Sequence, residues 1–129
     1  MKAEAVYRRV LVEADLDGED EAKRATAAVL QALRDRLTPN EADQAAAQLP
    51  RELKVLWWTG DAEGRRPEKM HRQEFYERVR ARGGLASLRE AREVTAAVFA
   101  ALKEQISPGE VDDICAQLPR DLKEVWEAA

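Results

Sequence analysis

The sequence predicts an all-α protein in which one four-helix unit occurs twice in tandem. The octamer AQLPRELK at residues 47–54 returns as AQLPRDLK at residues 116–123, an offset of 69 residues. At that offset, 17 of the 33 residue pairs between 25–57 and 94–126 are identical, as expected for a duplicated supersecondary unit. Good helix formers dominate the chain, and six Gly, five Pro and 5% aromatic residues argue against a β-sandwich or barrel.

The same offset predicts the domain organisation. We expect helical units at residues 1–57 and 72–129, joined by a connection at residues 58–71. A chain of 129 residues suits a single domain, which can bury roughly two thirds of the surface of its unfolded chain. We therefore expect residues 1–129 to fold as one pseudo-symmetric helical domain.

The first two helices of each unit are predicted from apolar residues at helical spacing. The first is short and combines a tyrosine with apolar residues: Val6, Tyr7, Val10 and Ala14, or Phe75, Tyr76 and Val79. The second is the longest and carries one apolar stripe: Ala22, Ala25, Val29, Leu33 and Leu37, or Ala91, Val94, Val98, Leu102 and Ile106. We expect this stripe to form the core of each unit.

The third helix of each unit has an explicit start, TPNE at residues 38–41 and SPGE at residues 107–110. Each motif offers a hydroxyl N-cap, a proline at the first helical position and a glutamate at the third. We expect Glu41 and Glu110 to complete capping boxes by bonding back to the cap backbone. The expected buried face is Ala42, Ala45, Ala46 and Leu49, or Val111, Ile114, Cys115 and Leu118.

The repeated octamer is predicted to be the corner between the third and fourth helices. Pro50 and Pro119 remove a backbone donor and disfavour helical geometry for the residue before them, so the third helix ends there. A short fourth helix then begins with the proline in its first turn. Its expected apolar face is Leu53, Leu56 and Trp57, or Leu122, Val125 and Trp126. A corner explains the repetition without an active site.

Composition narrows the function classes. The chain has 21 basic and 25 acidic side chains, and its formal charge of −4 weakly opposes general nucleic-acid affinity. No window approaches 18 consecutive apolar residues, and the N-terminal stretch lacks the apolar segment of a secretory signal. The single cysteine, Cys115, cannot form an internal disulfide. We expect a cytoplasmic protein without a membrane span.

The order of these motifs resembles a bacterial family known as domain of unknown function 2267. The resemblance is carried by Tyr-x-x-Val, by Ala-Val-Leu-x-x-Leu-x-x-x-Leu, by the twice-used Ala-Gln-Leu-Pro, and by Trp58, Pro67 and Glu74-Phe75-x-x-Arg78-Val79. It covers nearly the whole chain, and Ala-Gln-Leu-Pro is its most specific part. The resemblance implies an all-helical, two-unit bacterial protein with no established activity, and it brings no catalytic or ligand residue.

Residues that carry nucleophilic catalysis are sparse. His71, the only histidine, lies at the end of the connection, whereas Cys115 aligns with Ala46 on an apolar stripe. A nucleophile needs an adjacent base, and the sequence predicts no such pair. We therefore expect no catalytic residue.

Metal and phosphate sites are also weakly indicated. His71, Glu74 and Glu77 have a spacing that metal ligands can use, but acidic residues at this spacing are ordinary in a charged helix. Gly83 and Gly84 lack the spacing of a phosphate-binding loop and are expected to end a helix in left-handed geometry. We expect no metal and no cofactor.

One basic stretch could contact nucleic acid. Residues 63–82 carry seven basic and four acidic side chains, and the basic ones are Arg65, Arg66, Lys69, Arg72, Arg78, Arg80 and Arg82. The third helices are short and follow turns, as recognition helices often do, yet they begin TPNEADQ and SPGEVDD. Acidic residues at that end fit phosphates poorly, so the sequence disfavours nucleic-acid binding.

The connection breaks the repeat. Trp58, whose counterpart at the offset is Glu127, precedes a segment rich in Gly and Pro that contains Arg65 and Arg66. Tryptophan beside arginine is typical of an interface anchor, and we predict partner binding through Trp58, Arg65 and Arg66. The alternative is that Trp58 covers the seam between the two units.

These observations predict a non-catalytic protein-interaction or scaffold module that binds a protein partner or a second copy of itself. The absence of a nucleophile beside a base favours this function. The alternative is a small helical enzyme or ligand-binding protein that uses a carboxylate-lined cleft between the units.

Overall fold

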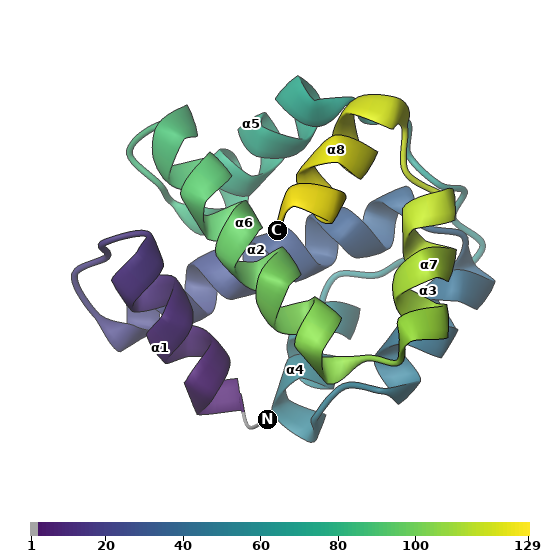
Figure 1. The fold of residues 1–129 in the computed structure, drawn as a ribbon, viewed down its shortest axis with the longest axis horizontal. Helices are drawn as coiled ribbons and strands as arrows, with labels where there is room; N and C mark the ends of the chain where they lie inside the picture. The colour runs from purple at the N-terminus through teal and green to yellow at the C-terminus, as the bar shows by residue number, and fades with distance from the viewer. Residues whose placement is uncertain (1–2) are drawn as a thin grey trace.

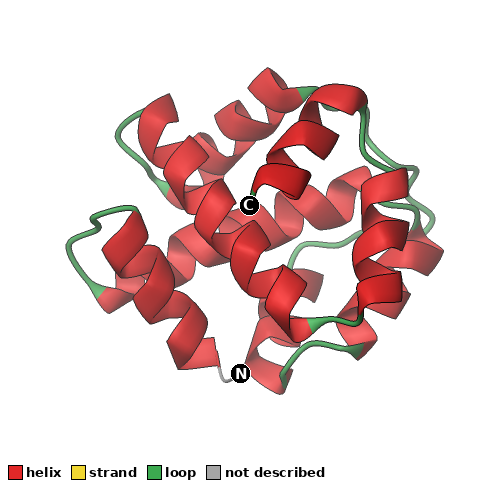
Figure 2. Ribbon diagram, viewed as in Figure 1, coloured by secondary structure: helices red, strands yellow, loops and turns green. Residues whose placement is uncertain are grey.

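The computed structural model describes residues 3–129 and contains eight helices and no strand in that range, which confirms the all-α fold class. The helices in chain order are α1 (Ala3–Glu13), α2 (Glu19–Arg36), α3 (Pro39–Ala47), α4 (Arg51–Trp58), α5 (Arg72–Gly83), α6 (Leu88–Gln105), α7 (Pro108–Ala116) and α8 (Arg120–Ala128) (Figure 1). Loops connect them throughout (Figure 2). None of these helices is long and apolar enough to cross a membrane.

The two halves contain the same helices in the same order. Moved by 69 residues, the bounds of α2 and α3 coincide with those of α6 and α7. The bounds of α1 and α4 match those of α5 and α8 to within one residue. The correspondence between the halves therefore extends over all four helices.

The two halves are interleaved. The long helices α2 and α6 cross at the centre, and α1 and α5 each pack against both of them (Figure 1). The first helix of each half thus contacts the long helix of the other half. α4 packs on α2, α8 packs on α6, and α3 lies against α7. Each half therefore covers apolar surface of the other.

The predicted apolar stripes form the core. The ten residues of the two predicted stripes, which include the C-cap residues Leu37 and Ile106, are all buried. The apolar residues predicted for α1 and α5 are buried too. The buried residues form one cluster that includes both halves. Phe99 belongs to this cluster and packs against two other aromatic residues, with its ring centroid 5.7 Å from that of Phe75 and 5.0 Å from that of Trp126. Burial of each large apolar side chain stabilises the fold by about 1.5–3 kcal/mol.

The capping boxes predicted for α3 and α7 form only in part. The hydroxyl of Thr38 accepts a bond from the Glu41 amide, and the hydroxyl of Ser107 accepts one from the Glu110 amide, both at 3.2 Å. The return bonds to the cap backbone come instead from glutamines of the opposite half.

The backbone N–H of Thr38 donates to Gln117 Oε1 at 2.9 Å, and that of Ser107 donates to Gln48 Oε1 at 2.6 Å. The prediction that glutamates bond back to the caps was therefore wrong. The physical reason is tertiary. Because α3 lies against α7, the glutamine at each corner reaches the helix start of the other half.

The repeated octamer forms the predicted corner. Leu49 and Leu118, which lie within the octamer, are buried. Pro50 and Pro119 are N-caps with extended backbone, so each proline precedes its helix. The prediction that each proline lies in the first turn was therefore wrong by one position. Each corner thus ends one helix, starts the next and presents its glutamine to the other half.

Candidate functional site

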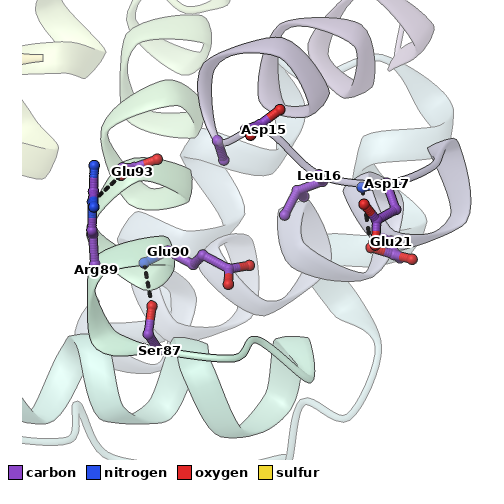
Figure 3. A pocket seen from close by; sticks show the side chains of 9 residues that line it. Asp15, Leu16, Asp17, Glu21, Ser87, Arg89, Glu90 and Glu93 are labelled. Atoms are coloured by element: carbon purple, nitrogen blue, oxygen red, sulfur yellow. Dashed lines mark hydrogen bonds and ion pairs between the residues drawn. The ribbon is translucent and has the colours of Figure 1, made fainter.

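An open hollow, the acidic groove, lies between the α1–α2 turn and the first turns of α6. It encloses about 450 Å³. Figure 3 shows its charged side chains: Asp15, Asp17 and Glu21 come from one half, and Arg89, Glu90 and Glu93 come from the other. The groove is therefore built by both halves.

Local bonds position the two sides of the acidic groove. Asp15 adopts a left-handed backbone conformation with φ 52°, which a short aspartate side chain tolerates well, and this lets the chain reverse between α1 and α2. The backbone N–H of Asp17 donates to Glu21 Oε2 at 3.3 Å. On the other side, Ser87 caps α6 by accepting a bond from the Glu90 amide at 3.2 Å.

The acidic groove has a net negative charge. Five residues with carboxylates and one arginine line it, and that arginine, Arg89, pairs with Glu93 at 3.0 Å. Within residues 3–129, no arginine or lysine nitrogen lies within 4.0 Å of the other four carboxylates. A concave surface lined by one sign of charge raises the local concentration of ions of opposite sign.

A second hollow of about 440 Å³ extends the acidic groove towards the end of α5 and shares Asp17, Glu21 and Glu90 with it. Gly84 ends α5 with φ 63°, which confirms the predicted left-handed helix end. A Cβ on Gly84 would lie 2.6 Å from Arg24 Nη1, so the glycine also makes room for this guanidinium. Arg24 Nε donates to the carbonyl of Arg82 at 3.2 Å, and this bond holds Arg24 at the α5 end of the second hollow.

A second group of carboxylates, the buried carboxylate cluster, consists of Glu41 from α3 with Glu110 and Asp113 from α7. One carboxylate oxygen from each residue lies within 4.8 Å of the other two. Glu41 is 6% exposed and Glu110 is 5% exposed, whereas Asp113 is exposed. The cluster thus has a buried base and an open side at Asp113.

The buried carboxylate cluster perturbs the protonation of Glu41. Burial, together with the neighbouring carboxyl groups of Glu110 and Asp113, raises the pKa of Glu41 from 4.5 to about 8. Two carboxylates in a low-dielectric space repel each other, so one of them favours the protonated form. The carboxyl pair at the α3–α7 contact can therefore hold a proton near neutral pH.

The residues predicted to bind a partner occupy three different environments. Trp58 is the last residue of α4, so the irregular stretch begins at Thr59, and the indole is 36% exposed. Arg65 is directed inward: its Nη1 donates to the Leu37 carbonyl at 2.8 Å and its Nε donates to Asp61 at 2.7 Å. Arg66 is exposed. Arg65 therefore closes the end of α2, while Trp58 and Arg66 reach the surface.

Much of the basic stretch is engaged in ion pairs. Asp35, buried at the end of α2, accepts bonds from Arg34 at 2.7 Å, Arg82 at 2.9 Å and Arg78 at 3.2 Å. Arg34 is buried too and donates to the carbonyls of α4 and the residue after it. These pairs fasten α5 to α2. They also balance the charge of arginines in the basic stretch that could contact nucleic acid.

The residues considered for catalysis, His71 and Cys115, belong to neither the acidic groove nor the buried carboxylate cluster. His71 precedes α5, and its Nδ1 lies 3.5 Å from Asp121 Oδ1. Cys115 is half-buried on α7, where burial, with a smaller effect of Glu127, raises the pKa of its thiol. A raised pKa disfavours the reactive thiolate.

The sequence raised a carboxylate-lined cleft between the units as an alternative, but it did not identify the residues of either carboxylate group as site residues. Glu21 and Glu90 correspond at the offset of 69, as do Glu41 and Glu110. In the structure, each of these pairs lies where the two halves meet. The signal in the sequence was therefore the repetition of acidic residues, but their position relative to one another depends on how the two halves pack.

The fold and these sites define a class: all-helical proteins with two interleaved halves and carboxylates gathered where the halves meet. The chain matches the family described as uncharacterized conserved protein (DUF2267) over residues 3–125, and it belongs to that family. The predicted family is therefore confirmed. No curated protein matches the chain.

Proposed function

We propose that this protein is a non-catalytic interaction module that binds a basic segment of a protein partner in the acidic groove. The observation that carries the proposal is the groove's charge: five residues with carboxylates, drawn from both halves, line it, with a single arginine to balance them. A lysine- or arginine-rich segment supplies the complementary charge, and long-range attraction speeds its association. A negatively charged groove also disfavours nucleic acid as the partner.

The proposed module is a tandem duplication. Residues 1–57 and 72–129 are two copies of a four-helix unit, joined by residues 58–71 and folded as one domain. Matching helix bounds, matching buried positions and the reciprocal glutamine bonds support this origin. Because each copy covers the core of the other, neither copy folds stably alone. The bacterial origin and the cytoplasmic location stay predictions.

A second candidate is a ligand-binding protein for a small polycation. The volume of about 450 Å³ favours it, because small-molecule sites commonly enclose roughly 300–1,000 Å³. This candidate uses the carboxylate-lined cleft between the halves that the sequence analysis raised as an alternative. An enzyme in the same groove would have to use the hydroxyl of Ser87, which accepts the cap bond from the Glu90 amide and has no histidine among the lining residues to activate it.

Fluorescence anisotropy with a labelled oligo-arginine peptide tests the proposal. We expect binding that weakens steeply with salt, and about tenfold weaker binding for the Glu21→Gln/Glu90→Gln variant, because each ion pair in an open groove contributes at most about 1 kcal/mol. The matched control is Asp43→Asn/Glu63→Gln, which removes the same charge from exposed residues outside the groove.

The two candidates give different outcomes. If spermidine displaces the peptide at concentrations far below those at which a simple salt weakens peptide binding, the small-polycation candidate is supported. If the peptide binds and spermidine does not displace it, the interaction module is supported. Equal weakening in the groove variant and the control would show that net charge, and not the groove, attracts the peptide.

A further inference from the structure

The buried carboxylate cluster is separate from the acidic groove and has properties that the scaffold does not require. Glu41 and Glu110 occupy equivalent positions in the first turns of α3 and α7, where their predicted role was to complete capping boxes. Gln117 and Gln48 perform that role instead. The two glutamate side chains are therefore free to point into the α3–α7 contact.

The strongest observation is that buried oxygen atoms of the cluster lack a hydrogen-bond partner outside the cluster itself. Glu41 Oε1 and Glu110 Oε1 are both buried, and among residues 3–129 no donor other than a proton held between the two carboxyl groups bonds to either. Buried polar atoms in native proteins are nearly always satisfied by protein, water or an ion. Both residues are more than nine-tenths buried, and their oxygens face the same space.

The geometry suits a cation. Oxygens that share one ion at metal–oxygen distances of about 2.0–2.6 Å lie no more than about 5 Å apart. The carboxylate oxygens of Glu41, Glu110 and Asp113 meet this limit, since all lie within 4.8 Å of one another. An all-carboxylate set is the type that Mg²⁺, Mn²⁺ and Ca²⁺ prefer, whereas Zn²⁺ favours sulfur and nitrogen.

The electrostatics also favour a cation. In residues 3–129, no lysine or arginine nitrogen lies within 4.0 Å of Glu41, Glu110 or Asp113. Three carboxylates therefore share a largely buried space without a protein counter-charge. Exposed Asp113 provides the open side through which an ion and its remaining water ligands can enter.

We propose that Glu41, Glu110 and Asp113 bind one oxygen-preferring divalent cation between the first turns of α3 and α7. The ion joins a ligand of the first half to two ligands of the second, and so fastens the two halves together. The site is independent of the acidic groove, and neither proposal requires the other.

The probe is Mn²⁺ itself, added to the full chain after chelator treatment and dialysis. The electron paramagnetic resonance signal of free Mn²⁺ measures bound metal directly. We expect one ion per chain and a higher melting temperature with Mn²⁺, Mg²⁺ or Ca²⁺.

Three variants remove ligands one at a time. Glu41→Gln and Glu110→Gln should each weaken Mn²⁺ binding by tenfold or more, and Asp113→Asn should weaken it less, since its carboxylate is the exposed one. The matched control is Asp112→Asn, which removes the same charge from the preceding residue, exposed on α7 but outside the cluster. Circular dichroism in chelator verifies that each variant folds.

Three outcomes would overturn the proposal. If no divalent ion binds, the cluster is a proton-sharing carboxyl pair only. If Mn²⁺ binds equally to wild type and to all three ligand variants, the ion lies elsewhere. Loss of binding in the acidic-groove variant Glu21→Gln/Glu90→Gln, with retention in Glu41→Gln, would place it in the groove.

Discussion

Gln48 Oε1 accepts a hydrogen bond from the backbone N–H of Ser107 at 2.6 Å, although the two residues are 59 positions apart. The same amide group donates to the Ser107 hydroxyl at 3.3 Å. Gln117 makes the equivalent pair of bonds with Thr38. Each half of the chain therefore caps a helix of the other, and the glutamine in the repeated Ala-Gln-Leu-Pro motif is the residue that does it.

The first prediction concerns this reciprocal cap. Gln48→Ala and Gln117→Ala should each destabilise the fold by about 1 kcal/mol, the usual cost of losing a helix cap. Urea denaturation measures the change. Gln44→Ala is the control, because Gln44 is exposed on α3 and alanine is the better helix former. A loss for Gln44→Ala as large as that for Gln48→Ala would contradict the assignment.

The second prediction separates a buried ion pair from its exposed counterpart. Asp35 pairs with three arginines and its side chain is 7% exposed, whereas Glu104, the equivalent residue, pairs with Arg9 at 2.9 Å and is 55% exposed. Asp35→Asn should destabilise the fold by about 3 kcal/mol because it leaves buried charge unpaired. Glu104→Gln should cost less than about 1 kcal/mol.

Chemical denaturation of both variants decides this second prediction. A Glu104→Gln loss equal to that of Asp35→Asn would show that the arginine network at the end of α2 has no special role in joining α5 to α2.

The third prediction concerns pH. The pKa of Glu41 rises from 4.5 in the unfolded chain to about 8 in the fold, so the folded state binds more protons between those values. The contribution of Glu41 to stability is therefore present below about pH 4.5 and is lost as the pH rises towards about pH 8. In chelator, wild type should lose stability over this window.

Glu41→Gln, whose amide stays neutral, should flatten that pH dependence and be the more stable protein at alkaline pH. Thermal melts from acidic to alkaline pH measure both curves, and Asp43→Asn serves as an exposed control on the same helix. Parallel curves for wild type and Glu41→Gln would contradict the raised pKa of Glu41.

The fourth prediction concerns the adjacent tryptophans of α4. Trp57 is 1% exposed and Trp58 is 36% exposed. Trp57→Ala should destabilise the fold by about 3–5 kcal/mol, whereas Trp58→Ala should leave the melting temperature nearly unchanged. A large loss for Trp58→Ala would mean that Trp58 covers the seam between the halves.

A surface role for the connection adds a second measurement. If Trp58 and Arg66 anchor self-association, Trp58→Ala and Arg66→Ala should shift the sedimentation of a concentrated solution towards monomer. Arg65→Ala tests structure instead, since Arg65 bonds to the Leu37 carbonyl. Unchanged sedimentation in both surface variants would remove this segment from self-association.

The sequence by itself determined the local structure. The periodic stripe from Ala22 to Leu37 specified a helix and its buried face, because helical geometry places residues at that spacing on one side. TPNE and SPGE specified where α3 and α7 begin, since a hydroxyl cap followed by proline acts on its own turn. Pro50 and Pro119 likewise specified the corners.

Only the tertiary structure decided what the repeated polar residues do. Gln48 bonds across to Ser107, Glu41 faces Glu110, and Glu21 and Glu90 line one groove, and each relationship joins the two halves. Local patterns cannot supply them. Helical periodicity states which face of a helix is buried, whereas the partner of that face depends on how the two halves pack, and here they interleave around α2 and α6.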